Sequence, residues 1–230
     1  MNASSDKKPT KVEQKVVVIT GGSQGIGRAL VEQFSDEGYK VITCGRSRAK
    51  FDNKNITYAS IDLGNPFHVQ TWLSDLKCID IIINNAGQLG ERGPVLDNDY
   101  MSWVDVHKVN VNAPFFVIKA AKEKLVKNAI IINISSSVGR KARADWGAYS
   151  VSKCALEAFT DILSEELEDA IVFSVNPGGT ATKMRSDAFP DEDPSSLPSA
   201  EKIASIILDW VKRPAELNGR KLNCRDELLF

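Results

Sequence analysis

The fold is most constrained by an alternation of short Val/Ile-rich runs with longer segments of helical periodicity. This alternation is typical of βαβ units around a parallel sheet, whose strands are covered by helices on both faces and are therefore apolar throughout. Strands are predicted at 15–20, 39–44, 55–60, 79–84, 129–134, 170–175 and, more weakly, 221–224. Apolar residues at three- and four-residue spacings predict helices at 25–37, 66–76, 113–127, 148–168 and 200–212.

Length and composition favour a single α/β domain. The chain has 230 residues, 43% of them hydrophobic and 26% charged, which is close to the globular average, and it contains no internal repeat or low-complexity linker. We expect one domain over residues 15–230, preceded by a flexible polar tail over residues 1–14. Residues 183–199 contain three prolines and an acidic run, so we expect a long exposed loop that serves as a substrate loop or lid.

Charge and cysteine content exclude several functional classes. The net charge of -1 provides no field to attract nucleic acid or an anionic membrane surface. The four cysteines form no cluster with metal-ligand spacing, so we expect reduced thiols and no metal site. No apolar run reaches the roughly 18 residues of a membrane span, and the charged N-terminus does not resemble a signal peptide. A cytoplasmic protein without nucleic-acid or membrane partners is therefore predicted.

A glycine-rich stretch, Thr20–Gly27, has the spacing TGxxxGxG and joins the first predicted strand to the first predicted helix. Glycine permits a tight turn and a close approach of the backbone to a pyrophosphate, and the helix N-terminus offers free N–H groups. This context predicts a dinucleotide site, although the stretch alone would also suit an ordinary turn. The candidate binding residues are Gly21, Ser23, Gln24, Gly25, Ile26 and Gly27.

Further motifs follow in the chain: the turn Asn84–Gly87 (NNAG), the run Asn133–Gly139, the pair Tyr149 and Lys153 (YxxxK), and Pro177–Thr182 (PGxxxT). Together with the glycine stretch, they resemble the classical short-chain dehydrogenase/reductase family over residues 15–182. The resemblance implies a Rossmann-type doubly wound parallel sheet of about seven strands with helices on both faces. The later segments Trp146–Tyr149 and Met184–Pro190 resemble a YciK-like bacterial subgroup of that family.

The resemblance implies an oxidoreductase that interconverts a carbonyl and an alcohol by hydride transfer. Tyr149 would donate or accept the proton. Ser136 lies 13 residues before Tyr149, which is the separation usual in the family, and would stabilise the substrate oxygen. Lys153 lies one helical turn after Tyr149, and a Lys⁺ about 4 Å away would lower the tyrosine pKa. The lysine would also bind the cofactor ribose, and Asn110 would hold a water that relays protons.

The expected cofactor is NADP(H). An NAD enzyme of this fold normally has Asp or Glu at the end of the second strand, where this chain has Gly45, followed by Arg46 and Ser47, which suit a 2′-phosphate. Alternatively, Arg46 is simply a solvated residue after a strand. By the same resemblance, further cofactor contacts come from Asp62, Leu63, Asn85, Ala86, Gly87, Tyr149, Lys153, Pro177, Gly178, Thr180 and Thr182.

Several alternatives stay open at this level. A non-catalytic NADP(H)-binding sensor or scaffold could use the same fold, although such a protein has no need for the full catalytic set. The family usually pairs subunits through the helices predicted here at 113–127 and 148–168, which implies a homodimer or homotetramer. The substrate is expected to be a small carbonyl or alcohol compound. The basic loop 140–143 could select an anionic substrate, or could be a solvated loop or a subunit contact.

Overall fold

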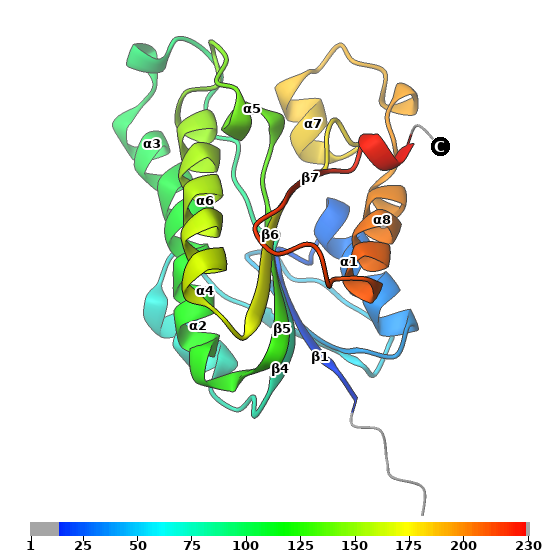
Figure 1. Cartoon of the computed structure of the whole chain (residues 1–230). Coiled ribbons are helices and arrows are strands. Elements are labelled where there is room, and N and C mark those ends of the chain that lie inside the picture. Colours follow the sequence, from blue (N-terminus) through cyan, green and yellow to red (C-terminus); the bar gives the residue numbers. More distant parts are fainter. Residues whose placement is uncertain (1–13, 229–230) are drawn as a thin grey trace, which may run out of the picture.

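A fully parallel sheet forms the centre of the protein in the computed structural model, which describes residues 14–228 (Figure 1). Its seven strands have the order β3-β2-β1-β4-β5-β6-β7. They are β1 (Val16–Thr20), β2 (Lys40–Gly45), β3 (Ile56–Ser60), β4 (Ile79–Asn84), β5 (Leu125–Ile134), β6 (Ala170–Asn176) and β7 (Lys221–Asn223). The strand order reverses between β1 and β4, where ligands bind in doubly wound sheets. The predicted fold class is confirmed.

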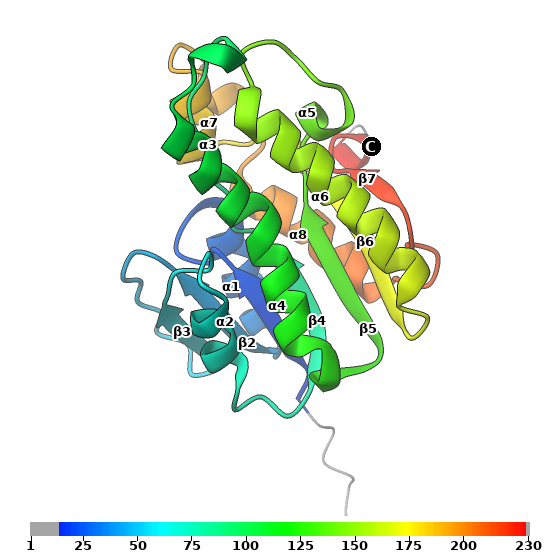
Figure 2. The same cartoon turned by 90° about the vertical axis from the view of Figure 1, so that its left-hand side faces the viewer.

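Helices cover both faces of the sheet. Helices α1 (Gly25–Asp36) and α8 (Ala200–Lys212) pack on one face, and α2 (Pro66–Leu73), α4 (Ala113–Ala121) and α6 (Gly147–Glu166) pack on the other (Figures 1 and 2). Successive residues of β1 point into opposite cores, with Val17 and Ile19 in the core beneath α1 and α8, and Val18 in the core beneath α2 and α4. This burial on both faces explains why the strand is apolar without alternation.

The helix predicted at 113–127 ends earlier, at Ala121. A short 3₁₀ turn follows, and Leu125 already belongs to β5, where it pairs with Ile79. Short apolar runs do not distinguish a helix end from a strand start by periodicity, and here the pairing with β4 decides between them. A helix that the pattern did not predict, α3 (Tyr100–His107), precedes α4; only Val106 of α3 is buried, so its apolar period is weak.

The segment 183–199 differs in part from the predicted loop. Its first six residues form a helix, α7 (Lys183–Ala188), whose first turn is capped by the Thr182 hydroxyl, which accepts a hydrogen bond from the Arg185 N–H. A 3₁₀ turn at Pro194–Ser196 follows, and the rest is irregular. A bridge between Ala181 and Ser199 brings the two ends of the segment together. The prolines of the segment all lie after the end of α7, so they interrupt regular structure only in the later part of the segment.

The predicted tail over residues 1–14 lies, apart from Gln14, outside the described residues. Gln14 donates a hydrogen bond from Nε2 to the Gly38 carbonyl at 2.8 Å. Within residues 14–228, no helix has both the length and the apolar character needed to cross a membrane. All four cysteines, Cys44, Cys78, Cys154 and Cys224, are free thiols.

Candidate active site

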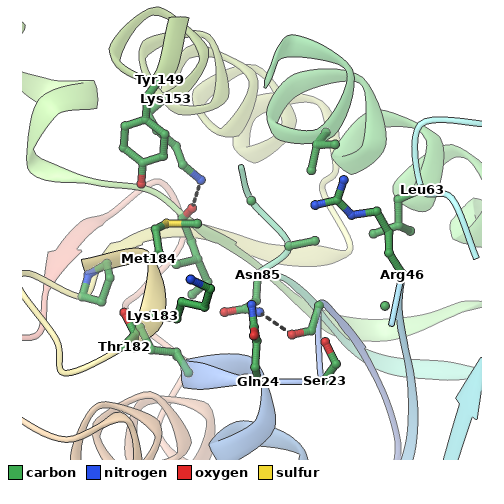
Figure 3. Close-up of a pocket in the computed structure, with 18 of the residues that line it drawn as sticks. Ser23, Gln24, Arg46, Leu63, Asn85, Tyr149, Lys153, Thr182, Lys183 and Met184 are labelled. Carbon is green, nitrogen blue, oxygen red and sulfur yellow. Dashed lines mark hydrogen bonds between the residues drawn. The ribbon is translucent and has the colours of Figure 1, made fainter. Parts of the chain in front are cut away.

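A cavity of about 220 Å³ opens at the carboxyl ends of β1 and β4, where the strand order reverses (Figure 3). In Figure 3, Tyr149 and Lys153 lie on one side of the cavity, and Arg46 and Leu63 lie on the other. The predicted site residues that line it are Gly21, Ser23, Gln24, Ile26, Arg46, Asp62, Leu63, Asn85, Ala86, Gly87, Tyr149, Lys153, Pro177 and Thr182. Residues from most of the predicted motifs therefore meet at one place.

The glycine loop is shaped for close packing and leaves the start of α1 open. A Cβ atom on Gly27 would lie 2.2 Å from the Gly21 carbonyl oxygen and 2.4 Å from Asn85 Nδ2, so only glycine fits there. Asn85 Nδ2 donates to the Thr20 carbonyl at 2.9 Å, which ties the loop to the turn after β4. The N-cap residue of α1, Gln24, makes no side-chain cap, so the first N–H groups of α1 are free to bind an anion such as a pyrophosphate.

Tyr149 and Lys153 extend from α6 at the wall of the cavity, and both are buried. The Lys153 Nζ donates to the Ile134 carbonyl at 2.7 Å and lies 5.7 Å from the centre of the Tyr149 ring. Burial raises the pKa of Tyr149 to about 12, and a hydrogen bond with Ser136 opposes this. Burial also lowers the pKa of Lys153 to about 8, against the charge of Glu157. The Lys153 ammonium is directed to the Ile134 carbonyl, and the expected lowering of the tyrosine pKa by Lys153 stays a prediction.

A second cavity, of about 110 Å³, adjoins Tyr149 and is lined by the predicted residues Ser136, Gly178 and Thr180. Ser136 precedes α5 (Ser137–Arg140), which begins directly after it. Trp146 also lines this cavity, with its ring centre 5.8 Å from that of Tyr149. The space beside the phenol is therefore suited to a substrate that reacts there.

Asn110 lies in a π-helical turn, Lys108–Asn112, between α3 and α4. Its Oδ1 accepts from the Gln88 N–H at 2.8 Å, and its Nδ2 donates to the Gln88 carbonyl and to Ser152 Oγ, both at 2.9 Å. Such π-turns are frequently found at functional sites. A Cβ atom on Gly87 would lie 3.6 Å from Asn110 Oδ1 and 3.8 Å from Lys153 Nζ, so the two side chains flank Gly87.

Arg46 follows the last residue of β2 and is exposed on the cavity wall. A Cβ atom at Gly45 would lie 2.7 Å from the Tyr58 hydroxyl, which explains a glycine at this position. Ser47, in contrast, does not line the cavity; its carbonyl accepts a hydrogen bond from Tyr58. Gly25 and Gly27 also lie outside the lining and act by shaping the loop.

Asp62 is held in place at the cavity wall by two neighbours. Its Oδ1 accepts from the Gly64 N–H at 2.9 Å, and its Oδ2 accepts from Lys108 Nζ at 3.3 Å. The Gly64 hydrogen bond is the main cause that lowers the pKa of the carboxyl group, and Lys108 adds to it. Asp62 is therefore ionised at neutral pH and positioned to accept hydrogen bonds.

Several cavity residues were not predicted. Lys183 and Met184 come from α7 and were absent from the predicted site residues, although they belong to the segment 183–199 that was expected to be a substrate loop or lid. The Ser135 hydroxyl is buried without a hydrogen-bond partner and lines both cavities. No spacing rule singled it out over Ser136. Ile61, Val109 and Ile134 complete the set, and Gly45, which was expected beside the 2′-phosphate but was not among the predicted contacts, lines the cavity as well.

The basic loop 140–143 lines neither cavity. Arg140 instead contacts the buried Glu157 of α6, with Nε 3.0 Å from Oε1. Lys141 and Arg143 are exposed. Within the described part of the chain, no group of three or more His, Cys, Asp or Glu side chains has an arrangement that could hold a metal ion.

Comparison with known proteins identifies the family of this chain. A family profile described as short chain dehydrogenase matches residues 15–193, which include the glycine loop, Tyr149 and Lys153. The chain belongs to the short-chain dehydrogenase family. It is 33% identical to the uncharacterized oxidoreductase YciK of Escherichia coli K12, over 87% of this chain and 86% of YciK. The predicted family and the resemblance to YciK are thus confirmed.

Two solved structures of such dehydrogenases hold the phosphorylated cofactor. A short-chain dehydrogenase of Shigella flexneri 2a complexed with NADP has a TM-score of 0.84 and 30% identity, covering 92% of this chain and 97% of that one. A short-chain dehydrogenase of Escherichia coli CFT073 complexed with NADPH has a TM-score of 0.84 and 31% identity, covering 91% of this chain and 95% of that one. This chain shares their fold.

Proposed function

We propose that this chain is an NADP(H)-dependent oxidoreductase that interconverts a carbonyl and an alcohol, with Tyr149 as the proton donor and acceptor. The observation that carries the proposal is the meeting of the buried Tyr149 phenol, Ser136 and Lys153 between two adjoining cavities. The larger cavity would hold the dinucleotide, and the smaller one would hold the substrate. When bound, the nicotinamide would supply or accept the hydride.

The protein side chains would handle the proton. With a pKa of about 12, the Tyr149 phenol is protonated at neutral pH and ready to donate to a carbonyl oxygen. Ser136, which lines the smaller cavity together with Tyr149, would donate a hydrogen bond to the same oxygen as negative charge develops there. Lys153 would bind the ribose after leaving the Ile134 carbonyl, and Asn110 would hold a relay water next to it.

Removal of the Tyr149 hydroxyl tests the proposal. Tyr149→Phe is expected to lower the rate of NADPH oxidation with a carbonyl panel by at least about 100-fold, while NADPH affinity stays within a few fold, because only the proton donor is lost. Tyr100→Phe, which removes a phenol that is 89% exposed on α3, is the matched control and should not change either value. Retention of most of the turnover in Tyr149→Phe would exclude the assignment. Cofactor binding without turnover of any substrate by the natural protein would favour a sensor.

We further propose that the cofactor is NADP(H) rather than NAD(H), with Arg46 binding the 2′-phosphate. The proposal is supported by the exposed guanidinium on the cavity wall, by the missing carboxylate at Gly45, and by the two relatives complexed with NADP or NADPH. A charge-assisted contact stabilises binding by about 1.5–3 kcal/mol, so Arg46→Ala should weaken NADPH binding by roughly 10- to 150-fold and leave NADH unaffected. Arg48→Ala, two residues further on and off the cavity, is the control. Equal affinity of the natural protein for NADH and NADPH would refute the assignment.

We also propose a homo-oligomer that forms through the face carrying α3, α4 and α6 (Figure 2). Large apolar side chains are exposed on these helices: Met101 and Val104 on α3, Phe115 on α4, and Val151 and Ile162 on α6. An apolar face of this kind is typical of protein interfaces. Ile162→Glu should yield monomers in light scattering, whereas Phe67→Glu on α2 should not; monomers in the natural protein would contradict the proposal. The cytoplasmic location stays a prediction.

A further inference from the structure

The smaller cavity beside Tyr149 contains one cation in its lining that hydride transfer does not require. Among the described residues that line it, Arg185 of α7 is the only one with a formal charge at neutral pH. The others are neutral, and include Trp146, Met184 and Leu89. Arg185 comes from the segment that follows Thr182, so α7 contributes a cationic residue to the cavity that Tyr149 also lines. A single cation in an otherwise uncharged cavity points to recognition of an anionic group.

The guanidinium already binds a carboxylate. Both oxygens of Glu192 accept hydrogen bonds from Arg185, one from Nε and the other from Nη2, the latter at 2.6 Å. This two-point fork is the geometry by which arginine recognises carboxylates. The guanidinium is also 3.8 Å from the centre of the Phe189 ring, a cation–π contact that helps to fix its orientation. Glu192 belongs to the same segment as Arg185, so the carboxylate that occupies the fork is an internal one.

We propose that Arg185 binds a carboxylate on the substrate and that Glu192 occupies this position until the substrate displaces it. The inference rests on the proposed function, and it names the substrate class as a small aldehyde or ketone that carries a carboxylate. Exchange of one carboxylate for another keeps the guanidinium paired throughout, so no charge is left desolvated. The Glu192 side chain is 28% exposed and can move into solvent. Trp146 and Met184 offer apolar surfaces for the carbon part of the substrate.

The surrounding charges are consistent with an exchange at this one pair. Two other carboxylates of the segment have partners of their own: Asp187 pairs with Lys183 at 3.0 Å, and Asp193 accepts hydrogen bonds from Ser195, whereas Asp191 is exposed. Two further guanidinium groups lie close by. Arg92 lies 4.1 Å from the centre of the Trp146 ring, and Arg225 donates to the Gly179 carbonyl at 3.1 Å. The local field around the fork is therefore favourable for a second anion that approaches while Glu192 departs.

The alternative is a purely structural role, in which Arg185 and Glu192 hold the segment 183–199 in place. The two roles differ in what removal of Glu192 does. If the pair is only structural, loss of either partner should disturb the cavity to a similar degree for every ligand. If Glu192 competes with the substrate, its removal should improve binding of an anionic ligand, while removal of Arg185 should abolish the preference for that anion.

The test uses 4-carboxybenzaldehyde and its methyl ester, titrated calorimetrically into the NADP⁺-saturated protein, where no reduction of the aldehyde takes place. We expect the natural protein to bind the acid a few fold more tightly than the ester, because the substrate carboxylate must displace Glu192, whereas a charge-assisted contact without a competitor is worth about tenfold or more. Arg185→Gln should lose this preference and bind the ester normally. Glu192→Gln should bind the acid severalfold more tightly than the natural protein. Asp193→Asn, which removes the neighbouring charge, is the matched control and should change neither affinity.

Equal affinity of Arg185→Gln and the natural protein for the acid would overturn the inference. So would weakening of both ligands by both Arg185→Gln and Glu192→Gln, which is the pattern of a structural pair. NADPH oxidation with the same two compounds separates this inference from the proposed function. Reduction of the ester without any preference for the acid would refute the carboxylate site while supporting the oxidoreductase proposal. Arg185-dependent binding of the acid without reduction of either compound would support the site and contradict the hydride-transfer proposal.

Discussion

The partly buried pair Arg140–Glu157 allows a quantitative prediction for stability. The Glu157 side chain is 5% exposed and the Arg140 side chain 23%, with Nε 3.0 Å from Oε1. Glu157 Oε2 also accepts from Ser174 Oγ at 2.8 Å, and Arg140 Nη1 donates to the Lys221 carbonyl at 3.2 Å. The pair thus ties α5, which begins just after Ser136, to α6, which carries Tyr149, and to the edge of the sheet.

Glu157→Ala would leave the Arg140 guanidinium without its countercharge. Breaking a buried pair in this way costs roughly 3–5 kcal/mol, and the partial exposure of Arg140 places this case near about 3 kcal/mol. For a chain of this size, one kcal/mol corresponds to about 2–4 °C in Tm, so we expect a loss of about 6–12 °C in calorimetric scans at matched protein concentration. Because α5 begins directly after Ser136, Ser136 should also be held less firmly in this variant.

The control is Asp169→Ala, which removes an exposed pair with Lys127 whose side chains are 79% and 77% exposed. Exposed pairs contribute at most about 1 kcal/mol, so its Tm should fall by no more than about 4 °C. An equal, small loss in both variants would refute the reasoning. The double variant Arg140→Met/Glu157→Leu should recover much of the loss, because neither charge is then left unpaired.

Three further predictions follow from the site. Burial lowers the pKa of Lys153 from 10.5 to about 8, so the proton on Lys153 destabilises the folded state at neutral pH. The free energy of unfolding should therefore rise as the pH increases from about 8 to 10.5. Lys153→Met should flatten that rise in denaturant titrations, and an unchanged slope would contradict it. Gly27→Ala should lower both Tm and NADPH affinity, because its Cβ would lie 2.2 Å from the Gly21 carbonyl oxygen; normal values would show that the loop can relax. Proteolysis within 183–199 should slow when NADPH and substrate are bound if the segment is a lid, and equal cleavage rates would exclude closure.

The sequence alone was sufficient for the fold class and for most of the cavity. Parallel strands buried on both faces, such as β1, must be apolar along their length, and this signal is local to each strand. The glycine loop was equally predictable, because Gly27 has no space for a side chain and that restriction is visible as a residue type. Tyr149 and Lys153 could be placed on one helical face from their spacing alone.

Only the tertiary structure decided how the site residues interact. The spacing of Tyr149 and Lys153 predicted that the two side chains lie close together. It could not predict the 2.7 Å hydrogen bond from Lys153 Nζ to the carbonyl of Ile134, which lies on β5, 19 residues earlier in the chain. The same holds for charge: the basic loop 140–143 suggested an anion site, yet Arg140 pairs with the buried Glu157, and Arg185 of α7 reaches the cavity instead. Residue types and periodicities report local backbone structure and burial. Which charged group meets which partner depends on contacts between distant segments, and these exist only once the sheet and its helices have packed together.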